Sequence, residues 1–258
     1  MLLTFNVGNR VISVGFVREG RVVARASLSA EKGRTADEYA LSLLSLLPLH
    51  GIKREDIGGA IGSSVFPALT ETVCTAVTLA FACRPHVLGS GIRTGLDIRT
   101  EDPAELGGDL VATAVGALTK YAPPLILVDF GTAITLSAID ASGAFLGCAI
   151  APGLALSSAS LAEATALLPN VSQKAPAHVI GKRTAESLQS GKLFGTAAMV
   201  DGMVSRMREE MGGHAAVVLT GHSALCVKPY LSAESEYAED LLLLGLAAIY
   251  EKNEKRKK

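Results

Sequence analysis

The sequence is poor in cysteine, lacks an excess of basic residues and has no long apolar run. Its four cysteines are scattered and form no CxxC motif, which is typical of reduced thiols and argues against a disulfide framework or a zinc site. The formal net charge is −1, whereas a nucleic-acid partner or an anionic membrane surface would favour a basic excess. Neither a membrane-spanning run nor a secretory signal is recognisable. These absences predict a cytoplasmic protein with no nucleic-acid or membrane partner.

What remains is the composition of a folded α/β protein. Of the 258 residues, 49% are hydrophobic and 19% are charged, which suits one large domain or two small ones. Pro48 is expected to end the first helix, and Gly191 and Gly195 are expected to break the longest one. The expected helices cover residues 35–47, 70–81, 111–118, 156–167, 184–210 and 234–250, and the expected strands outside the β-meanders cover 57–62, 86–88 and 215–220.

The stretch from residue 125 to 153 carries the most informative pattern. An apolar run ends on Asp129, Gly131 and Thr132 follow, and a second β-rich run begins at once. A strand, a tight Gly-Thr turn and a returning strand can bind a phosphate through backbone N–H groups and the Thr hydroxyl, while the Asp can hold a cation. A plain hairpin would show the same short pattern, so the stretch alone does not establish a phosphate site.

The N-terminal residues repeat this pattern at a fixed distance. Three positions have a counterpart 123 residues later, which pairs Asn6 with Asp129, Gly8 with Gly131, and Gly20 with Gly143. Two three-stranded meanders with matching turn glycines indicate an internal duplication. The sequence therefore predicts two α/β halves, residues 1–119 and 120–258, with a ligand in the cleft between them.

A third acidic position lies between the two meanders. Pro103 begins a segment in which Gly107 and Gly108 permit a close approach of the backbone to a ligand, and Asp109 starts an apolar helix. A carboxylate is favoured there by the helix dipole, and the alternative is that Asp109 is only the N-cap of the helix. Phosphoryl transfer from ATP needs this set of groups: turns for the phosphates, one acid for a cation and another to accept the proton of the attacking hydroxyl.

These blocks resemble the type III pantothenate kinases of the actin-like ATPase and sugar kinase superfamily. The family's DxGNT turn matches residues 6–10, its NPxxxGxDR block matches residues 102–110, and its DxGTATT turn matches residues 129–135. Further matches follow from 152 to 169, from 184 to 191 and at 220–221. The resemblance covers nearly the whole chain and implies two RNase H-like domains with mixed sheets and crossover helices.

The resemblance also implies a function and roles for single residues. It implies a cytoplasmic homodimer that phosphorylates pantothenate with ATP, the first step of coenzyme A biosynthesis, and that needs Mg²⁺ and a monovalent cation, K⁺ or NH₄⁺. Asp109 would be the general base and Asp129 the ligand of the monovalent cation. ATP would contact Asn6, Val7, Gly8, Asn9, Arg10, Val11, Ile12, Ser13 and Thr132, and pantothenate would contact Thr100, Gly107, Gly108, Asp109, Leu110 and Thr184.

Four positions depart from the family pattern. Asn6 stands where the family has Asp, Thr100 where Tyr is expected, and His222 where a second Gly follows the late Thr-Gly. Leu110 replaces the Arg that would pair with the pantothenate carboxylate, a loss of about 2–5 kcal/mol of binding free energy. Arg99, Lys182 and Arg183 are close in sequence to these blocks and are candidates for the missing positive charge.

The departures leave three interpretations open. The first is a working pantothenate kinase with a relaxed acceptor pocket. The second is a kinase of the same fold for another small hydroxylated acceptor, because Thr100 and Leu110 both lie on the acceptor side. The third is a non-catalytic nucleotide-binding or regulatory relative, although a decayed site would not be expected to keep Asp109, Asp129 and Thr132.

Overall fold

The structure is a computed structural model that describes residues 1–89 and 91–255. It contains two compact units, which are treated separately below. The first comprises residues 1–96, residues 101–120 and the C-terminal segment from Asp240 onward. The second comprises residues 97–100 and 121–239. The chain thus enters the second unit briefly at 97–100 and returns to the first unit at its end.

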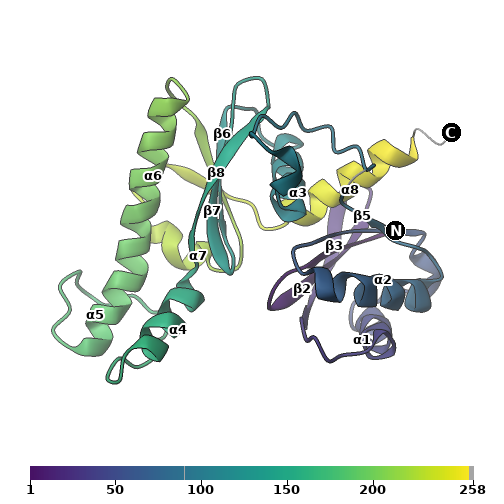
Figure 1. The fold of residues 1–258 in the computed structure, drawn as a ribbon, viewed down its shortest axis with the longest axis horizontal. Helices are drawn as coiled ribbons and strands as arrows, with labels where there is room; N and C mark the ends of the chain where they lie inside the picture. Colours follow the sequence, from purple (N-terminus) through teal and green to yellow (C-terminus); the bar gives the residue numbers. More distant parts are fainter. Residues whose placement is uncertain (90, 256–258) are drawn as a thin grey trace. The chain divides into compact units, whose positions relative to one another are not determined.

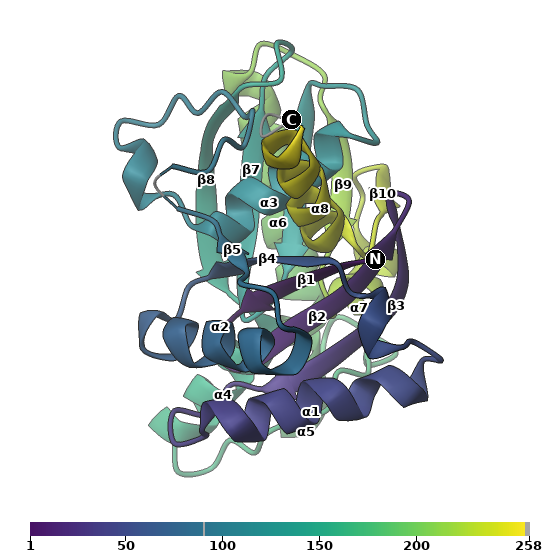
Figure 2. The same ribbon diagram turned by 90° about the vertical axis from the view of Figure 1, so that its right-hand side faces the viewer.

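The first unit is built on a five-stranded sheet with helices on both faces (Figure 2). Its strands are β1 (Leu2–Val7), β2 (Val11–Arg18), β3 (Arg21–Ser29), β4 (Gly59–Ser64) and β5 (His86–Val87), in the order β3-β2-β1-β4-β5. Its helices are α1 (Ala36–Leu49), α2 (Pro67–Phe81), α3 (Gly108–Leu118) and α8 (Leu241–Glu254), with short 3₁₀ turns at Arg54–Asp56 and Pro103–Glu105. Apolar residues of α1 and α2 form one core with β1 and β2, and those of α3 and α8 form a smaller core with β4.

The second unit repeats this sheet strand for strand. Its strands are β6 (Leu125–Phe130), β7 (Ala133–Ile139), β8 (Phe145–Pro152), β9 (Ala216–Thr220) and β10 (Ser235–Tyr237), in the order β10-β9-β6-β7-β8. In each unit the first strand pairs antiparallel with the second and parallel with the fourth. Its helices are α4 (Leu154–Ala164), α5 (Thr184–Ser190), α6 (Thr196–Glu210) and α7 (Ala224–Val227), with a π-helix at Gly191–Gly195 and a 3₁₀ turn at Lys228–Tyr230. The shared topology confirms the internal duplication.

The core of the second unit forms between the sheet and α6, which lies along one side of the sheet (Figure 1). Residues from β6 and β7, such as Val128 and Ile134, are fully buried against α6 residues such as Val200. None of the helices within residues 1–89 and 91–255 combines the length and the apolar character that crossing a bilayer requires.

Several expected element ends are wrong. Pro48 does not end α1, which continues to Leu49 after starting at the Thr35 N-cap. Gly191 and Gly195 do not break the long helix but bound a π-helix between α5 and α6. Residues 235–237 form an edge strand, so the last helix begins only at Leu241. In each case backbone hydrogen bonds determine where the element ends, and residue propensities alone do not specify those bonds.

The close crossing of α3 and α8 explains why the C-terminal helix belongs to the first unit. A Cβ atom placed on Gly116 would lie 1.9 Å from the carbonyl oxygen of Leu241, and one placed on Gly245 would lie 1.8 Å from that of Ala112. Both glycines therefore allow the two helix backbones to touch. The compact units accordingly differ from the halves 1–119 and 120–258 mainly in the position of α8.

Candidate active site

The first phosphate turn lies at the end of β1. The N–H of Gly8 donates to the carbonyl oxygen of Val11 at 3.0 Å, and a Cβ on Gly8 would lie 2.8 Å from that oxygen. Asn9 and Arg10 are exposed at the tip of the turn. Val7 and Ile12 face each other across the two strands and are buried, and Asn6 faces Ser13. Of the ATP residues expected from the sequence, Val7 and Ile12 thus hold the turn in place while the tip is open to a ligand.

Asn6 is held by a residue that the sequence did not single out. The hydroxyl of Ser63 donates to Asn6 Oδ1 at 2.8 Å, and Ser63 is fully buried on β4. The two residues are direct partners in the parallel β1–β4 pair. The only signal for Ser63 was the polar Ser-Ser end of an otherwise buried strand.

Asp109 lies in the first turn of α3. The N-cap is Gly107, so the interpretation of Asp109 as a mere N-cap is wrong. Its Oδ1 accepts a hydrogen bond from the N–H of Leu110 at 2.9 Å. Burial raises the pKa of Asp109, and this hydrogen bond together with one from its own N–H opposes the rise. A partly buried carboxylate with a raised pKa is typical of a general base.

The glycines before Asp109 bring it to the end of β4. A Cβ on Gly107 would lie 2.6 Å from Asp109 Oδ1, and one on Gly108 would lie 3.3 Å from Cβ of Ser63. Because β1 and β4 are parallel, their carboxyl ends meet at one edge of the sheet. Within the first unit, Asn6, Ser63 and the start of α3 therefore gather at this edge.

The second phosphate turn repeats the arrangement in the second unit. Gly131 N–H donates to the carbonyl oxygen of Ala133 at 3.1 Å, so this turn has two residues, Gly131 and Thr132, where the first has three. Thr132 is exposed, and its carbonyl oxygen accepts a hydrogen bond from Gly153 at 3.0 Å. Asp129 is the direct partner of Thr220 in the parallel β6–β9 pair, as Asn6 is of Ser63.

Gly221 lies against the Asp129 carboxylate. Its φ is +88°, and a Cβ there would lie 2.3 Å from Asp129 Oδ1. Only glycine satisfies both the backbone conformation and the close approach. His222, which follows, is exposed. Position 221 must therefore be glycine because the Asp129 carboxylate lies so close to it.

The expected acceptor residues are distributed over both units. Leu110 is half-buried on α3, while Thr184 is the exposed first residue of α5. Thr100 belongs to the short segment 97–100, and its buried hydroxyl has no hydrogen-bond partner in the described structure. A buried polar group without a partner is uncommon and is a frequent mark of a ligand site.

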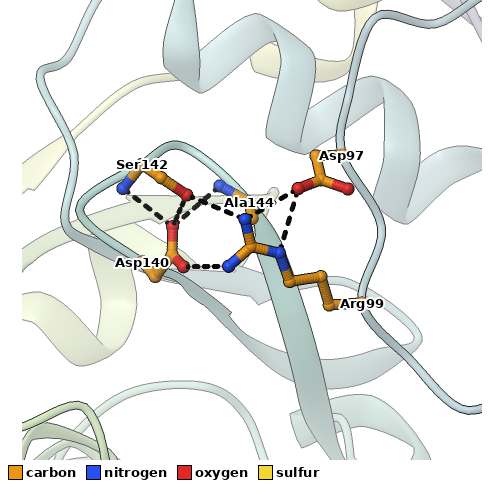
Figure 3. Close-up of polar contacts among 5 residues, drawn as sticks. All are labelled: Asp97, Arg99, Asp140, Ser142 and Ala144. Atoms are coloured by element: carbon orange, nitrogen blue, oxygen red, sulfur yellow. Dashed lines mark hydrogen bonds and ion pairs between the residues drawn. The ribbon is translucent and has the colours of Figure 1, made fainter.

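Arg99 is bound to two carboxylates and cannot replace the missing arginine without leaving them (Figure 3). Its Nε donates to Asp97 Oδ2 and its Nη1 to Asp140 Oδ2, both at 2.9 Å. The hydroxyl of Ser142 and the N–H of Ala144 hold the pKa of Asp140 below its ordinary value, and Arg99 adds to this. The segment 97–100 is thereby fastened to the β7–β8 turn, and the Ile98–Phe145 bridge reinforces the attachment.

The two turns offer few oxygen ligands for a cation. This suits cations that are bound mainly by a substrate. Within residues 1–89 and 91–255, no group of three or more His, Cys, Asp or Glu side chains forms a metal cluster. Asp129 supplies one carboxylate at the second turn, and Asn6 supplies a neutral amide at the first. Mg²⁺ commonly binds through substrate phosphates, water and one or two protein oxygens, which fits such a set.

Comparisons with known proteins agree on one family. The family described as "Type III pantothenate kinase" matches residues 2–206. The type III pantothenate kinase of Moorella thermoacetica is 37% identical over 253 residues, which cover 98% of this chain and 100% of that protein. The type III pantothenate kinase of Exiguobacterium sibiricum is 39% identical over 254 residues, which cover 98% of this chain and 100% of that protein.

A solved structure shows the same fold at low sequence identity. The activator of the 2-hydroxyisocaproyl-CoA dehydratase from Clostridium difficile with bound ADPNP has a TM-score of 0.57 and 14% identity, with 99% of this chain and 97% of that chain covered. The likeness concerns the fold alone, which is the duplicated α/β fold of actin-like ATPases and sugar kinases.

Proposed function

The chain belongs to the type III pantothenate kinase family, and from this premise we propose that it transfers the γ-phosphate of ATP to a hydroxyl of pantothenate. This is the first step of coenzyme A biosynthesis. The observation that carries the proposal is the half-buried Asp109 carboxylate at the start of α3, next to the strand ends that hold the first phosphate turn.

Asp109 is the proposed general base. Its raised pKa keeps the carboxylate basic enough to accept the proton of the attacking hydroxyl as that oxygen bonds to the γ-phosphorus. The N–H of Leu110 donates to Oδ1, which fixes the carboxylate and leaves Oδ2 for the substrate. Gly107 keeps the space beside the carboxylate free of a side chain.

The two turns are the proposed binding sites for the phosphates of ATP. Their backbone N–H groups, the Asn6 amide and the Thr132 hydroxyl supply hydrogen bonds without adding negative charge. The residues from Asn6 to Ser13 would contact the nucleotide on the first turn. The neutral Asn6 repels the phosphates less than Asp would and binds a cation more weakly.

Asp129 is the proposed ligand of the monovalent cation. Its carboxylate is positioned by β6 and by the close contact with Gly221. Bound Mg²⁺ would neutralise charge on the transferring phosphate, as it does in other phosphoryl transfers. The amide oxygen of Asn6 and the carboxylate oxygens of Asp129 would bind these ions or their water ligands.

The molecule that receives the phosphate has a second candidate besides pantothenate. Thr100, Gly107, Gly108, Leu110 and Thr184 would contact pantothenate. Because Leu110 brings no charge and Thr100 has an unpaired hydroxyl, a second small hydroxylated acceptor is the competing interpretation. A non-catalytic role is disfavoured by the retained Asp109 and Asp129.

We further propose a cytoplasmic homodimer that forms through the second unit. The apolar face of α8 is buried against α3 and β4 and is therefore not free for a partner. Large apolar side chains are exposed instead around α4 and the loop that follows it: Leu161, Leu167, Val179 and Ile180. The four cysteines form no disulfide with one another in the described structure, as in a reducing compartment.

A coupled assay of ADP release tests the proposed function. Purified protein is incubated with ATP, Mg²⁺ and K⁺, with pantothenate present or absent. Pantothenate-dependent ADP release is expected, and it should fall when Na⁺ replaces K⁺. ADP release that appears only with another polyol would favour the second candidate, and nucleotide binding without turnover would favour the non-catalytic relative.

A further inference from the structure

The side-chain amide of Asn6 is only partly bound by the protein. Its Oδ1 accepts the hydrogen bond from Ser63, and the side chain makes no other hydrogen bond within the residues that the structure describes. A side-chain amide carries two N–H donors and two acceptor lone pairs. Asn6 is half-buried, and its unpaired Nδ2 still reaches solvent. Both N–H groups of Nδ2 are therefore open to a ligand at the end of β1.

Ser63 determines which way this amide faces. Ser63 is fully buried on β4, and Asn6 Oδ1 is the one acceptor that its hydroxyl proton reaches among the described residues. If the amide were turned over, Nδ2 would donate to Ser63, and the hydroxyl proton of Ser63 would have no acceptor. A buried donor without a partner costs free energy, so the arrangement with Oδ1 toward Ser63 is favoured. Nδ2 consequently faces away from Ser63.

The packing around Ser63 keeps the pair in place. Ser63 and Asn6 are direct partners in the parallel β1–β4 pair, so the two strands fix the distance between them. A Cβ placed on Gly108 would lie 3.3 Å from Cβ of Ser63 and 3.4 Å from Cβ of Leu88, so the start of α3 packs closely over this end of β4. Because Ser63 is fully buried there, water cannot readily take the place of Asn6 as its partner.

We propose that Ser63 is a positioning residue, which holds the amide of Asn6 so that Nδ2 donates directly to a phosphate oxygen of ATP. The inference rests on the proposed function and deepens it at the first phosphate turn. An Asp at position 6 could accept the same hydrogen bond from Ser63 but could not donate to a phosphate. The second lone pair of Oδ1 stays available for a water ligand of Mg²⁺. Asn6 thus adds a direct contact with the nucleotide, and Ser63 acts only through Asn6.

Nucleotide affinity in the absence of Mg²⁺ separates a direct contact from one that a cation mediates. Calorimetry with a non-hydrolysable β,γ-imido analogue of ATP, in the presence of EDTA, is carried out on wild type, Asn6→Ala and Asn6→Asp. Both variants should bind the analogue about tenfold or more weakly than wild type, the usual effect of losing a hydrogen bond to a charged group. Asn6→Asp should bind more weakly than Asn6→Ala, because its carboxylate also repels the phosphates. Equal affinities of wild type and Asn6→Ala in EDTA would overturn the inference.

A double-mutant cycle tests whether Ser63 acts through Asn6. Ser63→Ala should weaken binding of the analogue about threefold or more, because the amide loses its fixed orientation, but it should have no further effect when position 6 is already Ala. The matched control is Ser64→Ala, which removes the neighbouring hydroxyl of β4. Ser64 contacts Thr70 and the N–H of Phe66 instead, so this variant should leave the affinity for the analogue unchanged. Urea unfolding of each variant measures any loss of stability separately.

The outcomes distinguish this inference from the proposed function. If Ser63→Ala has no effect, or weakens binding equally whether position 6 is Asn or Ala, the inference is wrong, even if wild type is an active kinase. If the two positions are coupled but pantothenate is not phosphorylated, the proposed function fails and the inference stands for nucleotide binding. Wild type that binds the analogue only with Mg²⁺ contradicts the direct contact, and wild type that never binds it contradicts both proposals.

Discussion

At the scale of single residues, the central claim concerns the ionisation of Asp109. Asp109→Asn removes the base and should lower kcat/KM by about 10²–10⁴-fold. In wild type, kcat/KM should fall as the pH drops through the raised pKa of Asp109, because only the ionised carboxylate accepts a proton. The pH profile of the residual activity of Asp109→Asn should lack this acidic limb. An unchanged kcat/KM in the variant would show that Asp109 takes no part in the chemistry.

The same pKa has a consequence for stability that separates catalysis from folding. The folded state binds this proton more tightly than the unfolded state, so the carboxylate costs stability once the pH exceeds its ordinary value of 3.8, and fully so above the raised pKa. Asp109→Asn should therefore have a Tm at neutral pH at least equal to that of wild type. The difference should shrink as the pH is lowered toward 3.8, and a variant less stable at neutral pH would contradict the assigned shift.

The sequence identified the acidic and amide residues at strand and helix ends, but not the groups that hold them. Asn6, Asp109 and Asp129 were predictable because each follows a recognisable run and matches a family block. Ser63 was not, since its contact with Asn6 comes from a parallel strand pair that is 57 residues apart in the chain.

At the scale of elements, the second turn depends on Gly221, the residue that follows β9. Gly221→Ala and Gly212→Ala both force alanine into positive φ, +88° and +79°, at a cost of about 1–2 kcal/mol each. Only the first places a Cβ against Asp129, since nothing lies within 4 Å of the second. Gly221→Ala should therefore raise the K⁺ concentration for half-maximal rate about tenfold or more.

The matched pair makes the measurement specific for the cation site. Steady-state rates against K⁺ concentration and urea unfolding are recorded for both variants. Gly221→Ala should lose more stability than Gly212→Ala, because its Cβ would also lie 2.7 Å from backbone atoms of Phe130. The K⁺ response should change in Gly221→Ala alone. An unchanged K⁺ response in Gly221→Ala would show that Asp129 is not the cation ligand or is not displaced by the new methyl group.

Element types were more predictable than element ends. The start of α1 was predictable, and the capping box formed by Thr35 and Glu38 explains why it is locally determined. The strand at residues 235–237 was missed because its pairing with β9 is not local. A break was expected because Gly191 and Gly195 have low helix propensity, whereas the helix continues there as a π-helix whose Leu193 is buried in the core of the second unit.

At the scale of the whole molecule, the duplication was predictable and the return of the last helix was not. Glycines that recur at a fixed distance along the chain reveal the repeat. The sequence does not show which surface the apolar C-terminal helix packs against, because that depends on the shapes of both surfaces. The glycines of α3 and α8 supply that fit in the first unit. The resulting chain path fastens residues from both ends of the sequence into one compact unit.

The α3–α8 contact should dominate the stability of the first unit. Gly245→Ala places a methyl group 1.8 Å from the carbonyl oxygen of Ala112, so the helices must separate. Overpacking of this kind costs about 1–3 kcal/mol or more, which urea unfolding would detect. The control Gly195→Ala is also helical but has nothing within 4 Å, and it should gain about 0.5–1 kcal/mol. Equal stabilities of the two variants would contradict the close crossing.

The most direct test of the proposed function is the identity of the product. Wild type and Asp109→Asn are incubated with ATP, Mg²⁺, K⁺ and pantothenate, and the products are quantified by mass spectrometry. We expect 4′-phosphopantothenate and ADP in equal amounts from wild type, with formation at least about a hundredfold slower in the variant. Wild type that binds ATP but forms no more 4′-phosphopantothenate than a protein-free control would contradict it.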